Sequence, residues 1–215
     1  MVEDAKIVVH NSVDCEIRVI GAGVTTGGID GNNTNWVPTQ AQVKLDGGSY
    51  LSVFSGNSPD VDPDAVVWAK RLNDGAEISF GGRYYLDQWS PTYSSDAGSN
   101  NIQILKNGDY PPTAYPLHSS PTLKSFMMPY LDGQGRIKIG PLDLIVMMEL
   151  TQPPTNANSP AYDLQDMVLL ATFKPKGNNG HGNNIDGVDS SNPGKSKPVD
   201  PSGTIDDEGA KGKKK

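Results

Sequence analysis

Three carboxylates in the last third of the chain have the type and spacing best suited to holding a ligand. Glu149 lies in an apolar run over residues 144–150, and Asp163 and Asp166 lie at the start of another run that extends to residue 173. Loops rich in Asp, Asn and Gly supply the oxygen ligands that Ca²⁺ prefers. If both runs are paired strands, the carboxylates meet at one end of the pair, and we predict a calcium site there. The alternative is that Asp163 and Asp166 only start and cap the second strand or point to solvent.

A second candidate set of oxygen ligands lies near the C-terminus. Asn183, Asn184, Asp186 and Asp189 follow one another closely in a segment rich in Gly and Asn. They are the alternative, weaker calcium site, and the other interpretation of this segment is a solvated linker. Neither set has the strict spacing of a helix–loop–helix calcium loop with its terminal Glu.

Aromatic side chains alternate with hydrogen-bonding ones over residues 84–93. Flat rings offer apolar area to one face of a sugar while a polar edge stays hydrated, so this segment and a Trp in an Asn-rich loop predict a glycan-binding module. The candidate residues are Tyr84, Tyr85, Trp89, Tyr93 and Trp36. The alternative is that Tyr85 and Trp89 are core or interface anchors. Exposed and coplanar rings would favour the glycan site.

The residue types that commonly perform catalysis have no suitable spacing. His10, His118 and His181 lie in a strand edge, a Pro-rich connector and the Gly/Asn-rich tail, without paired spacing for zinc or a serine elbow nearby. The segment from Gly21 to Gly23 lacks the third glycine and the following amphipathic helix of a phosphate-binding loop. Carboxylates are plentiful, but the sequence selects no glycosidase pair among them. We therefore predict that the protein is not an enzyme.

Composition excludes two classes of partner. The formal net charge is −7, and Lys and Arg form no stripe before the last residues, which argues against nucleic acid. No apolar run reaches the length of a membrane span, and no signal peptide is visible at the start.

The single cysteine, Cys15, cannot form an intramolecular disulfide. Alternation places it on the same face as Val13, Ile17 and Val19, where it is predicted to be a small buried apolar residue.

The elements that position these residues are short strands separated by Gly-, Asn- and Asp-rich turns. This spacing predicts an all-β or β-rich fold with an antiparallel β-sandwich architecture. In the first half the strands are expected at residues 6–10, 15–20, 41–45, 50–54, 66–70 and 77–80. The segments 46–48 and 73–75 resemble hairpin turns.

The second half adds a strand near residues 101–105 and one short helix. Ser119 or Ser120 would cap that helix, with Pro121 at its first position. The two apolar runs described above suit central strands covered on both faces. We predict a β-rich domain over residues 1–173, with two subdomains, 1–98 and 99–173, as the alternative. Residues 174–215 have too few apolar side chains to offset the entropy of ordering and are expected to be disordered.

The N-terminal segment Ile7, Val8 and Val9 is a candidate for self-association by strand addition. A strand near the chain end is easily detached, and a sheet edge offers unpaired N–H and C=O groups to another copy. Flanking charges at Glu3, Asp4 and Lys6 would then set the register rather than block the pairing. The alternative is an ordinary intramolecular first strand.

The tail over residues 177–194, with its Asn-Asn-Gly-His-Gly-Asn-Asn core, resembles the linkers of bacterial surface, repeat-in-toxin-type and adhesin-like secreted proteins. Glu149-Leu150 with residues 161–168 resembles the close of a small bacterial β domain that often occurs in calcium-dependent surface proteins, although Pro153 and Pro154 depart from that pattern. The resemblance implies an extracellular or cell-surface location. It implies a non-catalytic structural or adhesive protein that associates with itself as a surface or filament component. The implied partners are copies of the same chain, and glycan or other cell-surface material. The alternatives are a glycan-binding module and a virion surface or tail subunit of a bacteriophage.

Overall fold

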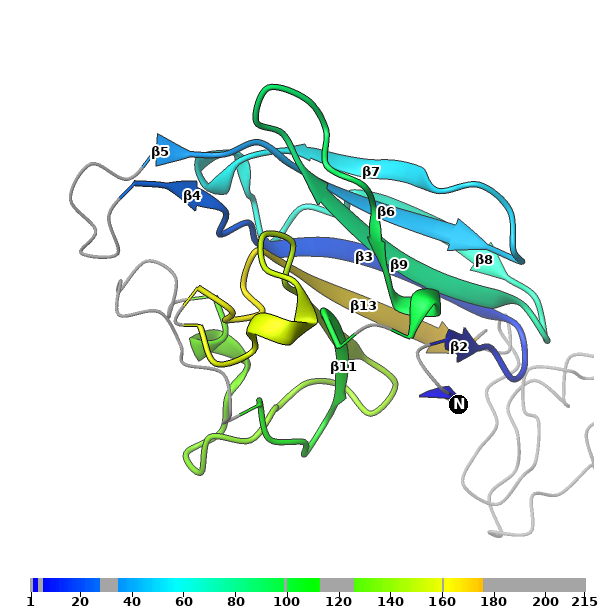
Figure 1. Ribbon diagram of the computed structural model, residues 1–215. Helices are drawn as coiled ribbons and strands as arrows, with labels where there is room; N and C mark the ends of the chain where they lie inside the picture. The colour runs from blue at the N-terminus through cyan, green and yellow to red at the C-terminus, as the bar shows by residue number, and fades with distance from the viewer. Residues whose placement is uncertain are drawn as a thin grey trace, which may run out of the picture. The chain divides into compact units, whose positions relative to one another are not determined.

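Two antiparallel sheets make a β-sandwich in the part of the chain that this computed structural model describes, namely residues 2–3, 6–27, 35–98, 100–112, 126–159 and 161–175 (Figure 1). The first sheet has the order β1 (Val2–Glu3), β2 (Lys6–Val8), β9 (Glu77–Tyr84), β6 (Thr39–Leu45) and β7 (Leu51–Gly56), and β10 (Tyr93–Ser94) also pairs with β9. The second sheet has the order β11 (Ile102–Lys106), β12 (Leu144–Met148), β13 (Met167–Pro175), β3 (Val13–Gly21) and β8 (Trp68–Leu72). A separate pair joins β4 (Thr25–Thr26) to β5 (Asn35–Trp36).

Alternation along the strands divides the apolar side chains between two clusters. Val146 and Met148 of β12 belong to the cluster between the two sheets, whereas Ile145 and Met147 belong to a second cluster. The second cluster includes Tyr162 and other residues from the irregular segments around residues 127–139 and 162–164. All five residues of β12 are buried, because its two faces are covered by different parts of the chain.

The strands expected from the sequence are confirmed, with ends shifted by a few residues. Cys15 is buried in the inter-sheet cluster beside Val13, Ile17 and Val19, as alternation predicted. The turn after β6 is a hairpin, because β6 pairs antiparallel with β7. The segment 73–75 is not a hairpin turn, because β8 before it and β9 after it belong to different sheets.

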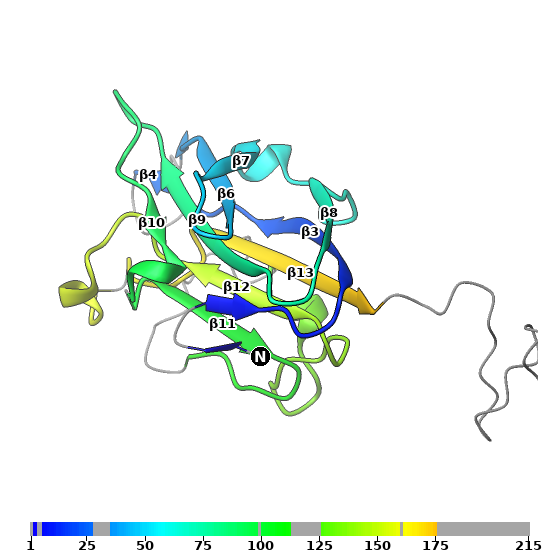
Figure 2. The same ribbon diagram turned by 90° about the vertical axis from the view of Figure 1, so that its right-hand side faces the viewer.

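Strands from both halves of the chain share the second sheet, in which β13 lies between β12 and β3 (Figure 2). Gly23, just after β3, donates its N–H to the carbonyl of Asp166, just before β13. Near the opposite end, Lys174 forms an ion pair with Glu16. These contacts show that β3 and β13 run in opposite directions and connect residues more than a hundred positions apart.

Helical structure among the described residues is limited to 3-10 turns. They are Ser58–Asp60, Ser95–Ala97, Met128–Tyr130 and Pro154–Asn156. The expected helix starting at residues 119–121 lies outside the described residues, except for its last part, where residues 128–130 form one 3-10 turn. The tail expected to be disordered likewise lies outside them beyond Pro175, the last residue of β13.

Candidate functional site

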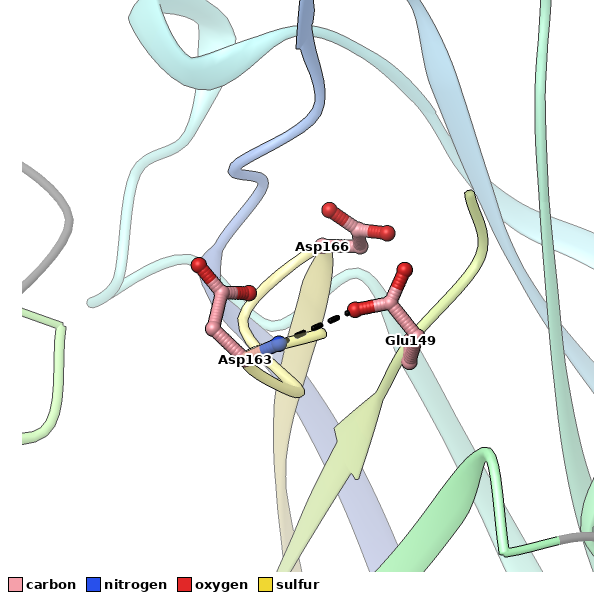
Figure 3. A group of neighbouring side chains, drawn as sticks. All are labelled: Glu149, Asp163 and Asp166. Carbon is pink, nitrogen blue, oxygen red and sulfur yellow. Dashed lines mark hydrogen bonds between the residues drawn. The ribbon is translucent and has the colours of Figure 1, made fainter. Parts of the chain in front are cut away.

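The structure brings Glu149, Asp163 and Asp166 together at one end of the second sheet (Figure 3). Each offers a carboxylate oxygen within 4.8 Å of the oxygens offered by the other two. The cause is the pairing of β12 with β13, which continues as a bridge between Met148 and Gln165. Glu149 directly follows one strand and Asp166 directly precedes the other, so strand pairing alone places them side by side.

Glu149 is fully buried and organises the loop that follows it. Its Oε1 accepts hydrogen bonds from the N–H of Thr151 at 2.9 Å, the hydroxyl of Thr151 at 2.8 Å and the N–H of Gln152 at 2.8 Å. Its Oε2 accepts the N–H of Asp163 at 3.1 Å. The carboxylate therefore links the segment after β12 to the segment before β13.

The two aspartates have fewer donors. Asp166 Oδ2 accepts the N–H groups of Leu150 at 2.7 Å and Thr151 at 3.1 Å, and Asp163 Oδ1 accepts the N–H of Gln165 at 3.1 Å. Within the described part of the chain, the second oxygen of Asp163 accepts no hydrogen bond. Among the described residues, the cluster thus has at least one carboxylate oxygen, Asp163 Oδ2, without a protein donor.

Burial sets the electrostatics of the cluster. Loss of hydration on burial, together with the nearby charge of Glu149, outweighs the hydrogen bond from Gln165 and raises the pKa of Asp163 to about 7. Burial, followed by the charges of Glu149 and Asp163, raises the pKa of Asp166 well above its ordinary value. Among the described residues, no Lys, Arg or His forms an ion pair with any of the three carboxylates. Their negative charge is uncompensated, and it requires either protons or a cation.

The donor set is that of a hard cation. Carboxylate oxygens with backbone carbonyls and water are the ligands of Ca²⁺ and Mg²⁺, whereas zinc and soft metals favour His and Cys. The three carboxylates come from two loops rather than a rigid helix, which suits the variable geometry of Ca²⁺ better than the strict octahedron of Mg²⁺.

The aromatic residues predicted to bind glycan do not come together in one exposed surface. Tyr84 and Tyr93 are half-buried and pack against the inter-sheet cluster, and Trp36 is half-buried in β5. Tyr85 is 41% exposed and meets Trp89 edge-on, with ring centres 5.2 Å apart and ring planes at 63°. The two rings are therefore not coplanar and do not form a flat platform.

Tyr93 connects the two candidate sites. Its pKa is raised first by burial, then by the charges of Tyr84, Glu149 and Asp166. The carboxylate cluster thus lies close enough to Tyr93 to affect the pKa of its phenol.

The remaining candidate residues lie away from the carboxylate cluster or outside the residues that the structure describes. Ile7 and Val9 are buried, and β2 already pairs with β1 on one side and β9 on the other, so strand addition there requires β2 to detach. His10 is exposed just after β2. The other candidates lie outside the described residues: His118, His181 and the tail set Asn183, Asn184, Asp186 and Asp189.

Two polar residues at the cluster were not identified from the sequence. Asn101 is fully buried and donates its side-chain N–H groups to the carbonyls of Glu149 at 2.9 Å and Gln152 at 2.7 Å. Gln165 is 1% exposed, and neither its amide oxygen nor its amide nitrogen has a hydrogen-bond partner among the residues that the structure describes. Gln165 stands between the two predicted aspartates in sequence, which is a local signal, whereas nothing local indicates Asn101.

Comparison with known proteins returns no family model, no curated sequence and no solved structure that matches this chain. Among the described residues, no helix has the length and apolar character needed to cross a membrane.

Proposed function

We propose that this protein is a non-catalytic structural or adhesive β-sandwich of the cell surface or extracellular space, in which Ca²⁺ bound by Glu149, Asp163 and Asp166 holds one end of the sandwich together. The observation that supports it is the convergence of these buried carboxylates without a cationic partner among the described residues. The ion would join the loop after β12 to the loop before β13. Extracellular modules commonly bind Ca²⁺ with dissociation constants of roughly 10⁻⁴–10⁻³ M, which matches a site with few charged ligands on loops.

A structural role fits the cluster better than catalysis does. Glu149 has no exposed surface, and Asp163 and Asp166 are each 6% exposed, so a substrate has little access to them. The hydrogen bonds of Glu149 hold backbone groups in place rather than leaving a carboxylate free to transfer protons. Self-association with copies of the same chain, as in a surface filament, completes this proposal.

The test is thermal unfolding of the whole chain at pH 7.5, with a chelator or with increasing Ca²⁺. A ligand that binds only the native state at 100 times its dissociation constant adds about 2.7 kcal/mol. For a chain of this size that corresponds to a rise in Tm on the order of 5–10 °C. Light scattering of the same samples reports whether the Ca²⁺-bound protein associates.

Asp163→Asn is the informative variant, because an Asn oxygen can still accept the N–H of Gln165. We expect it to lose most of the Ca²⁺-dependent rise in Tm while staying folded. Asp87→Asn, at an exposed position, is the matched control and should keep the full rise. If the melting curve of the wild-type protein is the same in chelator and in millimolar Ca²⁺, the calcium site is refuted.

Glycan binding is the second candidate function, and one observation favours it. The loop between β9 and β10 extends beyond the sheet edge and carries the exposed Tyr85 next to Trp89 (Figure 1). Its two rings stand at an angle, which suits contact with two sides of a small ligand rather than stacking under a flat sugar face.

A further inference from the structure

Arg83 differs from the other three arginines because it forms no ion pair with a carboxylate among the described residues. Arg18, Arg71 and Arg136 each form an ion pair, with Glu16, Asp14 and Asp132 respectively. Arg83 contacts no carboxylate among the described residues. A half-buried guanidinium without a negative partner indicates a place for an anion that is not part of the described chain.

Neighbouring side chains hold the Arg83 guanidinium in one orientation. Arg83 Nε donates to Gln40 Oε1 at 2.8 Å, as their pairing across β9 and β6 allows. The guanidinium carbon lies 4.7 Å from the centre of the Trp89 ring, in a cation–π contact. The Nε contact and the stacking occupy one edge and one face of the group. Within the described part of the chain, the N–H groups of Nη1 and Nη2 have no hydrogen-bond partner, and their geometry matches a carboxylate in a bidentate arrangement.

The groups around Arg83 suit a sugar. The side-chain nitrogen of Gln40 reaches the hydroxyl of the exposed Ser55 at 3.4 Å, which places amide and hydroxyl groups on the same face of the sheet. On the other side, a bridge between Tyr85 and Trp89 closes a tight hairpin and fixes both rings before any ligand arrives. An acidic side chain of a peptide would use the arginine but not this combination of rings, hydroxyl and amide.

We propose that Arg83, Gln40, Ser55, Trp89 and Tyr85 bind an acidic saccharide, with the carboxylate of a uronic-acid-type sugar on Nη1 and Nη2 of Arg83. The site lies on the first sheet and does not rest on the proposed calcium site. It builds on the glycan-binding alternative by naming a ligand class. It also places recognition on the outer face of β6 and β9 rather than on Tyr84 and Tyr93, which pack inward.

The experiment is calorimetric titration of the full chain in chelator with a galacturonic acid trimer, a neutral galactose trimer and an acetylated Glu-containing peptide. We expect the uronate trimer to bind at least about tenfold more tightly than the other two, because only it satisfies both the guanidinium and the rings. The side-chain NMR signals of Arg83 Nε–H and the Trp89 indole should shift on addition of the trimer. Chelator keeps Ca²⁺ from bridging sugar and protein, so failure of the calcium site leaves this result unaffected.

Arg83→Lys keeps the positive charge but loses the planar pair of N–H donors that binds a carboxylate in a bidentate geometry. We expect it to weaken binding of the uronate trimer at least about tenfold. Arg71→Lys, which changes an exposed arginine of the other sheet, is the matched control and should bind as the wild type does. Unchanged melting curves identify both variants as folded. The proposal is overturned if Arg83→Lys binds the trimer as tightly as the wild type, if both Lys variants weaken it equally, or if the acidic peptide binds as well as the acidic sugar.

Discussion

Replacing Asp163 by Asn should change how the stability of the sandwich depends on pH. The side chain is buried, and its Oδ1 accepts the N–H of Gln165 at 3.1 Å. Asn has nearly the same shape and can keep that hydrogen bond. The substitution therefore removes a titrating charge and little else.

The direction and size of the effect follow from the pKa of Asp163. Burial raises this pKa from 3.8 to about 7, so the native state keeps a proton that the unfolded state releases near pH 4. The stability linked to this proton is fully present below the unfolded pKa and is lost as the pH rises through the native pKa. At about 1.4 kcal/mol per pKa unit, the loss reaches roughly 4 kcal/mol by pH 8.

Urea unfolding at several pH values between 4 and 8, in chelator and followed by tryptophan fluorescence, measures the effect. The wild-type free energy of unfolding should fall over this range by roughly 4 kcal/mol more than that of Asp163→Asn, and the variant should be the more stable protein at pH 8. Asp87→Asn should follow the wild type, because Asp87 is exposed. Parallel profiles for the wild type and Asp163→Asn, or a less stable variant at pH 8, would refute the assignment of an uncompensated buried carboxylate.

Two further substitutions test other parts of the fold. Asp96→Asn removes the negative charge and one of the two oxygens that accept from Lys44 and Tyr50, so we expect a loss of roughly 2 kcal/mol in the free energy of unfolding near pH 7, measured by urea unfolding. Gly82→Ala places a methyl group 2.9 Å from Leu150 Cδ2, and overpacking there should cost about 1–3 kcal/mol and lower the Tm.

Each of these substitutions has a control or a distinguishing result. At Asp96 burial favours the neutral form, but the hydrogen bonds from Lys44 and Tyr50 outweigh it and lower the pKa to about 2. The contribution of Asp96 is present above pH 4 and is lost as the pH falls toward 2, so wild type and Asp96→Asn should converge in acid. Gly133→Ala meets no atom within 4 Å and should leave the Tm nearly unchanged. Equal effects at Gly82 and Gly133 would contradict the packing argument.

The strands and their buried faces were predictable because alternation is a local signal. Residues 144–148 and 167–173 are almost continuously apolar, which indicated strands covered on both faces, and β12 and β13 are such strands. Turn chemistry was less informative. Residues 73–75 have hairpin composition yet lead from one sheet to the other, because local backbone preference does not decide which sheet the next strand joins.

The carboxylate cluster could be predicted from the sequence because Glu149 and Asp166 flank two strands that pair. By contrast, Asn101 reaches the cluster across 48 residues and Gln40 reaches Arg83 across 43 residues. Those contacts depend on which strands become neighbours and in which register. Neither property is encoded near the residues concerned.

Asp96 and Asp163 show how environment separates a structural carboxylate from a functional candidate within one sandwich. Asp96 is held by an ammonium group and a phenol, so its charge stabilises the native state and its pKa falls. Asp163 is buried close to the charge of Glu149, without a cationic partner among the described residues, so its own charge destabilises the native state and its pKa rises. The charges of this cluster lower the stability of the native state unless protons or a cation neutralise them. Binding of a cation would account for a cluster of this kind. Bound Ca²⁺ would turn this group of buried carboxylates into a link between two loops that no disulfide can join, since Cys15 is the only cysteine.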